Sequence, residues 1–87
     1  MHAVVVTVTI SDHEVAESHL REQVVAGVSQ APGFVAGYWT RKDDSGVGMV
    51  IFESEDAAEA MSERVPSMVP DVVTVENIEV REVVAQA

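Results

Sequence analysis

One stretch of the chain, residues 31–53, constrains the fold more than any other because it predicts two adjacent strands. Pro32 and Gly33 end whatever precedes them, since proline has no N–H to donate to a helix and disfavours helical geometry in the residue before it. Residues 34–40 are then rich in the β-branched and aromatic side chains that suit a pleated, half-buried surface. Residues 47–52 return as a second apolar segment, so the stretch predicts a β-hairpin.

The connection between these two strands, residues 41–46, combines charged side chains with Asp, Ser and Gly. This composition is typical of an exposed turn, where glycine is the residue that adopts a positive φ without steric cost. We therefore expect the turn to be polar and Gly46 to take the positive φ.

The segment before the hairpin predicts one strand followed by one helix. Strict alternation over residues 3–10 gives the strand a strongly apolar face and a mildly apolar face. Ser11 and Glu14 have the spacing of a capping box, which predicts that a helix begins at this point. The strongly apolar face of the strand carries Val4, Val6, Val8 and Ile10, and the other face carries Ala3, Val5, Thr7 and Thr9. The apolar stripe of the helix recurs at every fourth residue, at Ala16, Leu20, Val24 and Val28.

The segment after the hairpin predicts a second helix and a last strand. Ser54 is an expected N-cap with acidic residues in the turn that follows, and the helix is expected to end before Pro66. Residues 72–85 form the expected last strand, but their alternation changes phase at Glu76 and Asn77. A phase change of this kind indicates a β-bulge.

This order of elements indicates the α+β class and the ferredoxin-like βαββαβ sandwich, formed as one domain over residues 1–87. Right-handed crossovers place the first and third strands in the centre of a four-stranded antiparallel sheet and both helices on one of its faces. The other face keeps apolar side chains with no helix to cover them, which predicts an interface or a ligand cavity. The long last strand at a sheet edge favours pairing with a second copy of the chain, with Val73, Val75, Ile78 and Val80 in the contact.

Composition narrows the classes of function. The chain has 87 residues, no cysteine, and 15 Asp and Glu against 5 Lys and Arg, for a formal charge of −10. Nucleic acid is excluded as an expected partner because binding it requires a basic surface. The absence of a long apolar run predicts no membrane span, and the absence of cysteine fits a reducing compartment, so we expect a cytoplasmic protein.

The layout and the run PGFVAGYW at residues 32–39 resemble the dimeric α+β barrel superfamily and, within it, the antibiotic biosynthesis monooxygenase-like proteins. The resemblance covers nearly the whole chain. It implies a homodimer whose sheets face each other around a cavity, and it implies chemistry such as cofactor-independent oxygenation of polyketide quinones. The haem-degrading members use a histidine near the second helix and an asparagine on the first strand. This chain has no histidine after His19 and carries Thr7 and Thr9 on that strand, so the resemblance implies no haem here.

Few residues have side chains in a pattern that indicates catalysis or metal binding. The imidazoles of His2, His13 and His19 do not have helical ligand spacing, and no thiolate exists, so we expect no metal and no cofactor. No serine has a histidine and a carboxylate at a recognisable spacing, and the catalytic residues are therefore left unassigned.

The candidate site is a ligand-binding surface on the uncovered face of the sheet. Thr7 and Thr9 face away from the expected helix side, and Trp39 offers a flat ring for a planar ligand. Arg41 adds a cation at the rim for an anionic group. The third strand shows either the row of Val47, Met49 and Ile51 or the row of Gly48, Val50 and Phe52 on this face, and we assign Phe52 to the site.

Two functions fit these observations. In one, the chain is a monooxygenase-like protein that oxidises a small aromatic or polyketide-like substrate without a cofactor, in a pocket enclosed by the dimer. In the other, the same cavity binds a small planar organic ligand or a protein without turnover. Titratable residues inside the cavity favour the enzyme, because proton transfer needs a positioned acid or base.

Overall fold

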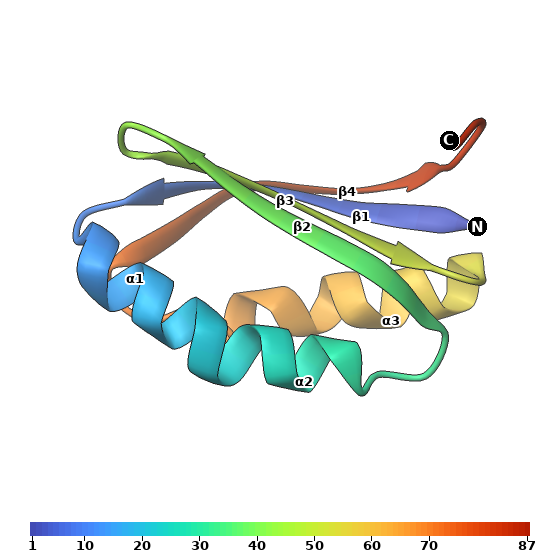
Figure 1. The fold of residues 1–87 in the computed structure, drawn as a ribbon, viewed down its shortest axis with the longest axis horizontal. Helices are drawn as coiled ribbons and strands as arrows, with labels where there is room; N and C mark the ends of the chain where they lie inside the picture. The colour runs from blue at the N-terminus through green and yellow to red at the C-terminus, as the bar shows by residue number, and fades with distance from the viewer.

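The computed structural model describes every residue from Met1 to Ala87, and it consists of a four-stranded antiparallel sheet with helices against one face (Figure 1). The strand order β2-β3-β1-β4 places β1 and β3 in the centre, which confirms the predicted ferredoxin-like βαββαβ fold. No helix is both long enough and apolar enough to cross a membrane. In chain order the elements are β1 (His2–Ile10), α1 (His13–His19), a π-helical segment (Leu20–Val24), α2 (Val25–Ser29), β2 (Phe34–Lys42), β3 (Ser45–Phe52), α3 (Glu55–Arg64), a 3₁₀ turn (Val65–Ser67) and β4 (Val73–Glu82).

Strand register decides which side chains face the helices. In the central pair, Val4 of β1 lies opposite Val50 of β3 and opposite Val80 of β4. Val4 and Phe52 are fully buried, so this row and the end of β3 form the centre of the core. The buried core cluster is Val4, Val28, Val50, Phe52, Ala58 and Met61.

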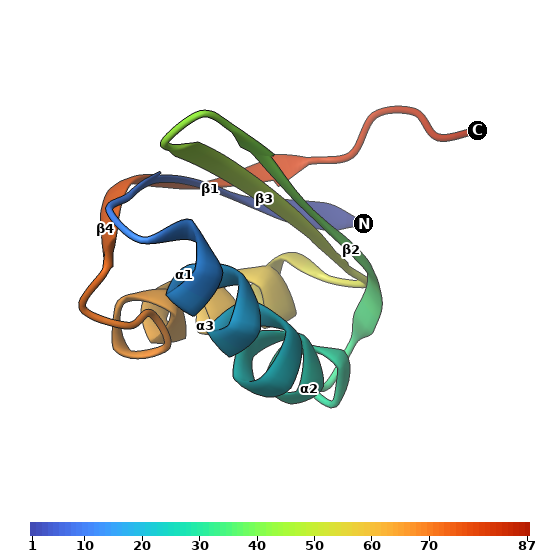
Figure 2. The same cartoon turned by 60° about the vertical axis from the view of Figure 1, so that its left-hand side comes forward.

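The first helical region is continuous from His13 to Ser29 but contains the π-helical segment in its middle (Figure 2). In a regular α-helix a step of four residues advances by about 40° beyond a full turn, so a stripe with strict four-residue spacing winds around the helix. A π segment, with its wider i→i+5 turn, absorbs the excess. Four residues with this spacing, Ala16, Leu20, Val24 and Val28, therefore all face the sheet.

The first helix is capped one residue later than the sequence predicts. The Asp12 side chain accepts a hydrogen bond from the Val15 N–H at 3.1 Å. Ser11 instead donates its hydroxyl to the Val72 carbonyl oxygen at 3.2 Å, so its side chain joins the start of α1 to the start of β4. The Ser54 cap of α3 is as predicted, with the Ala57 N–H donating to its hydroxyl at 3.2 Å.

The hairpin turn also differs from the prediction. β2 extends to Lys42 and β3 begins at Ser45, so only Asp43 and Asp44 connect them. Asp43 takes the positive φ, at 54°, and Gly46 lies within β3. Aspartate tolerates this region because its side chain is short and polar, which leaves the glycine available for packing.

The bulge in β4 is confirmed, and the contact of this edge strand with a second copy stays a prediction. Pairing with β1 shifts after Thr7, which leaves Glu76 as the extra residue. Ile78 and Val80 pack against the core, and Val73 lines a cavity beneath the sheet. Together with Val75, which pairs with Val8, these residues lie on the helix side and are partly buried.

The different roles of Ser11 and Asp12 can be separated by mutation. We expect Asp12→Ala to lower the free energy of unfolding by about 1 kcal/mol, because one N–H in the first turn of α1 loses its partner. Ser11→Ala should cost less, since the hydroxyl is exposed and no helical N–H depends on it. Urea denaturation of both variants tests this. A larger loss in Ser11→Ala than in Asp12→Ala would contradict the assignment of the cap.

Candidate functional site

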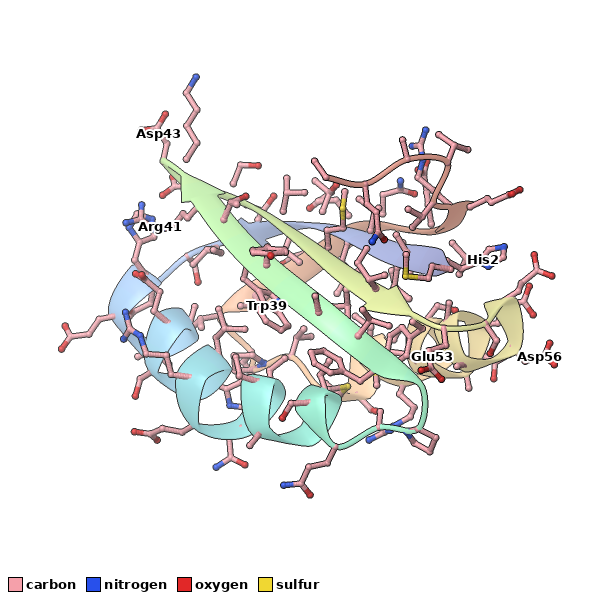
Figure 3. The ribbon with its side chains drawn as sticks, turned by 45° about the vertical axis from the view of Figure 1, so that its right-hand side comes forward. His2, Trp39, Arg41, Asp43, Glu53 and Asp56 are labelled. Atoms are coloured by element: carbon pink, nitrogen blue, oxygen red, sulfur yellow. The ribbon has the colours of Figure 1, made fainter.

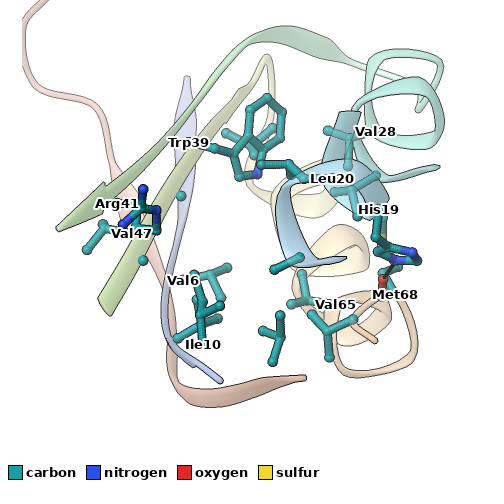
Figure 4. Close-up of a pocket in the computed structure, with 18 of the residues that line it drawn as sticks. Val6, Ile10, His19, Leu20, Val28, Trp39, Arg41, Val47, Val65 and Met68 are labelled. Carbon is teal, nitrogen blue, oxygen red and sulfur yellow. Dashed lines mark hydrogen bonds between the residues drawn. The ribbon is translucent and has the colours of Figure 1, made fainter. Parts of the chain in front are cut away.

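A cavity of about 210 Å³ lies between the helix-facing side of the sheet and the helices (Figure 4). Most of the residues that line it are apolar, and they come from the sheet, from both helical regions and from the turn after α3. Its walls include Val6 and Ile10 of β1, Leu20 and Val28 of the first helical region, and Val65 from the turn after α3. A space with this lining takes up an apolar molecule more readily than a polar one.

Glycines on two strands create the room for this cavity. Gly46 and Gly48 lie on the helix-facing side of β3, opposite Arg41 and Trp39 of β2. A methyl group added to Gly48 would lie 2.9 Å from the Trp39 Cδ1 atom, and one added to Gly37 would lie 2.7 Å from its Cη2 atom. The indole therefore occupies the hollow that Gly37 and Gly48 leave, with its pyrrole end over Gly48 and its benzene end over Gly37.

The pyrrole edge of Trp39 carries the one side-chain N–H that points into the apolar part of the cavity (Figure 4). Its Nε1 donates no hydrogen bond within the chain. Among the side-chain polar atoms, only His2 Nδ1 is both fully buried and without a hydrogen-bond partner. Trp39 Nε1 also has no partner, so it is not fully buried and is accessible from the cavity. An indole N–H in an apolar site normally finds an acceptor, which makes this group a candidate contact for a ligand.

A charged pair marks the mouth of the cavity. Arg41 Nε lies 3.6 Å from Glu17 Oε2 of α1, and Glu17 Oε1 lies 3.7 Å from Arg21 Nη2. Arg41 also donates through Nη1 to the Asp43 carbonyl oxygen at 3.0 Å. Figure 3 shows Arg41 and Trp39 on the same strand, with the indole directed toward the helices.

A third polar group, His19, holds one wall of the cavity in place. Its Nε2 lies 2.8 Å from the Met68 carbonyl oxygen, so this nitrogen carries the hydrogen and donates it. The contact joins the end of α1 to the segment after α3, and the π-helical segment begins at the next residue. π-Helical turns within α-helices often lie at functional sites, and Leu20 and Val24 of this one both line the cavity.

The other two histidines are engaged away from this cavity. His13 Nε2 lies 2.8 Å from Asp44 Oδ1, and His2 Nε2 lies 3.7 Å from Glu55 Oε2. No group of three or more His, Cys, Asp or Glu side chains is arranged to hold a metal ion.

The predicted site residues fall on two different faces. Thr7 and Thr9 lie on the uncovered face as expected, where Thr9 donates its hydroxyl to Glu76 at 3.2 Å. Trp39 and Arg41 do share one row of β2, but that row faces the helices, so their placement on the uncovered face was wrong. Phe52 was also misplaced: it is fully buried in the core. The cavity thus unites Trp39 with Arg41, and the role of all five residues in substrate binding stays a prediction.

From the sequence alone, neither Glu17 nor the glycines of β3 were connected with a cavity. The alternation of glycine with valine and methionine over residues 46–50 was the available signal, because glycine in a strand interior often marks a close approach to another group. Glu17 had no such signal, since its pairing with Arg41 depends on how α1 crosses the sheet.

The uncovered face of the sheet has an apolar row that crosses β2, β3 and β1. Tyr38 of β2, Met49 of β3 and Val5 of β1 lie side by side in one row. Tyr38 is 68% exposed and Met49 is 43% exposed, so large apolar groups meet solvent here. On β4 the same face becomes charged, with Arg81 donating to Glu79 at 2.8 Å.

Among the solved structures that share this fold are two of MhuD. One is a mutant of MhuD with two manganese protoporphyrin IX bound per active site; it has a TM-score of 0.68 and 15% identity, over 100% of this chain and 98% of that one. The other is the heme-degrader MhuD from Mycobacterium tuberculosis with two hemes bound in its active site, with a TM-score of 0.56 and 18% identity over 97% and 98%. No protein-family model and no curated protein matches the sequence. The likeness establishes the fold, in agreement with the fold that the sequence predicts.

The glycine hollow under Trp39 gives a direct test of this arrangement. We expect Gly48→Ala to lower the free energy of unfolding by about 1–3 kcal/mol and to shift the Trp39 emission, because the new methyl group displaces the indole. Gly27→Ala is the matched control, since a methyl group there meets nothing within 4 Å. That exposed helical position should gain about 0.5–1 kcal/mol with no change in emission. Thermal unfolding followed by fluorescence measures both, and equal stability of the two variants would refute the packing of Trp39 against Gly48.

Proposed function

We propose that this chain is a monooxygenase-like protein that binds a small planar aromatic molecule in the cavity beneath Trp39 and oxidises it without a bound metal. The observation that carries the proposal is an apolar cavity holding one flat indole, with a carboxylate and a guanidinium at its mouth. Trp39 supplies the surface for an aromatic ring, and the valines around it exclude water.

The size of the cavity supports a ligand with one or two rings. Pockets for drug-sized molecules usually measure about 300–1,000 Å³. The cavity here, at about 210 Å³, lies below that range. A bicyclic phenol such as 1-naphthol therefore serves as the representative substrate.

The residues around the cavity do not fit a metalloporphyrin, the class of ligand in both MhuD structures. The side chains of β1 that face the cavity are all aliphatic: Val4, Val6, Val8 and Ile10. The one imidazole in the lining is His19, and its Nε2 is already bonded to the Met68 carbonyl oxygen. Neither a free imidazole Nε2 nor an amide on β1 is therefore presented to a haem. We derive no step through this group.

Oxidation without a metal requires the substrate to supply the electrons. For 1-naphthol, O₂ takes four electrons from the ring, and one oxygen atom becomes the carbonyl oxygen at C4. The other leaves as water with the phenolic proton and the C4 hydrogen, so the products are 1,4-naphthoquinone and water and no external reductant is consumed. Glu17 is the carboxylate at the mouth that accepts the first proton, and Arg41 stabilises the resulting phenolate.

A second function, binding without turnover, has one specific observation in its favour. The charged groups at the mouth are already paired with each other and with Arg21, and His19 is bonded to the backbone. Proton transfer requires one of these pairs to open, whereas binding of an apolar ring does not.

We also propose that the uncovered face of the sheet is covered by a second copy of the chain. Tyr38, Met49 and Val47 are all at least 40% exposed on this face, in a chain that buries only 11 of its 87 residues. Small domains bury a low fraction of their surface and gain stability by association. A homodimer formed through this face leaves the cavity beneath Trp39 on the far side of each sheet.

Two variants on adjacent residues of β1 test where the ligand binds. We expect 1,4-naphthoquinone to quench the emission of Trp39 saturably, and Val6→Phe to weaken this binding at least about tenfold, because the larger ring fills the cavity. Thr7→Val changes a side chain on the uncovered face and should leave the affinity unchanged. The reverse pattern would move the site to the uncovered face.

Oxygen uptake with 1-naphthol then decides between the two functions. If the protein is an enzyme, Glu17→Gln should slow turnover by about 100-fold or more while the quinone still binds. General acid–base groups accelerate reactions by a factor of about this size. Quinone binding by the wild-type protein with no oxygen uptake identifies a binding module instead.

The homodimer is tested by sedimentation at micromolar concentration. We expect the wild-type chain to sediment as a dimer with a melting temperature that rises with protein concentration. Met49→Lys should dissociate it by placing a charge in the contact, and Gln30→Lys, which adds the same charge at an exposed helix end, should not. A wild-type monomer with a melting temperature independent of dilution would refute the dimer.

A further inference from the structure

We infer that Trp39 and Arg41 determine which aromatic ligand the cavity accepts, by donating hydrogen bonds to two oxygen atoms on opposite sides of its ring. The inference rests on the proposed function and specifies the ligand class and its orientation. The ligand carries a carbonyl oxygen at Trp39 Nε1 and a second, preferably ionised, oxygen at Arg41.

The polar groups around the cavity differ in the hydrogen-bond donors and acceptors that they leave unpaired. Trp39 Nε1 donates to nothing in the chain. Arg41 uses Nε toward Glu17 and Nη1 toward the Asp43 carbonyl oxygen, which leaves Nη2 unused. Both carboxylate oxygen atoms of Glu17 face arginine nitrogens, and His19 Nε2 donates to the Met68 carbonyl oxygen. Free donors therefore outnumber free acceptors, and donors select a ligand that carries acceptors.

Charge at the mouth favours an anionic oxygen at the Arg41 end. Glu17 lies between Arg21 and Arg41, so these three side chains sum to +1 in a chain whose formal charge is −10. A hydrogen bond from a guanidinium to an ionised oxygen is stronger than one between neutral groups. The other end, around Trp39, is lined by Val6, Leu20 and Val28, where an uncharged carbonyl oxygen is less costly to bury.

The spacing of the two side chains along β2 limits the spacing of the two oxygens. Trp39 and Arg41 are two residues apart on one strand and point to the same side. Their Cα atoms are thus about 6.6 Å apart, at about 3.3 Å per residue. This distance suits oxygens at para positions of one ring better than adjacent oxygens. A para-quinone, the product of the proposed oxidation, has this arrangement, and the phenol that precedes it carries one of the two oxygens.

The experiment compares three probes of the same bicyclic size by equilibrium dialysis: naphthalene, 1,4-naphthoquinone and the 2-hydroxy-1,4-naphthoquinone anion. Trp39→Phe keeps a ring but removes the N–H, and should weaken the naphthoquinone by about threefold to tenfold while naphthalene changes by less than twofold. Arg41→Gln should weaken the hydroxynaphthoquinone anion by about tenfold, with a smaller effect on the neutral quinone.

Equal losses for naphthalene and naphthoquinone in Trp39→Phe would show that the ring acts only by packing and would overturn the inference while the proposed cavity stands. Equal losses for the neutral quinone and the anion in Arg41→Gln would overturn the assignment of Arg41. If no probe binds the wild-type protein, both the inference and the proposed function fail. Should Trp39→Phe not fold, the wild-type affinities decide: a preference for naphthoquinone over naphthalene supports the hydrogen bond, and equal affinities refute it.

Discussion

The packing of the Trp39 indole over Gly37 and Gly48 is the contact on which the interior of this protein depends. A sheet whose central strand carried larger side chains here would press directly against the helices and leave no cavity. Gly46 and Gly48, on the helix-facing side of β3, have no side chains to fill this space. The Trp39 indole fills only part of it. What is left is the space beneath Trp39, bounded by aliphatic side chains and open at Arg41.

The helix opposite this space is adapted to the same geometry. Its apolar side chains recur at every fourth residue, a spacing that a regular α-helix turns away from the sheet after a few steps. The π-helical segment at Leu20–Val24 restores the alignment, and it does so beside the cavity. His19 then ties this region to the Met68 carbonyl oxygen, so the wall formed by the helix and the wall formed by the segment after α3 are held together.

The two faces of the sheet differ because helices cover only one of them. The helix-facing side provides the core and the proposed ligand site, including both residues that we infer to orient the ligand. The uncovered side presents Tyr38 and Met49 to solvent and is the proposed contact between two copies. The proposed ligand site and the proposed contact between copies therefore lie on opposite faces, and substitutions in one can be made without direct change to the other.

The sequence alone determined the order of the elements, the two rows of the first and third strands, the bulge at Glu76 and the cap at Ser54, because these depend on neighbouring residues. Because Trp39 and Arg41 are two residues apart, the sequence also places them in one row of the second strand. It did not determine which face that row occupies, since alternation sorts side chains into two sets without saying which set meets the helices. Pairing with β3 decided this, through a register shift between Phe34 and Ala36 that leaves Val35 exposed and turns Trp39 inward. The pairing of Glu17 with Arg41 likewise required the tertiary structure, because only the crossing of α1 over the sheet brings two residues from distant segments to the same opening.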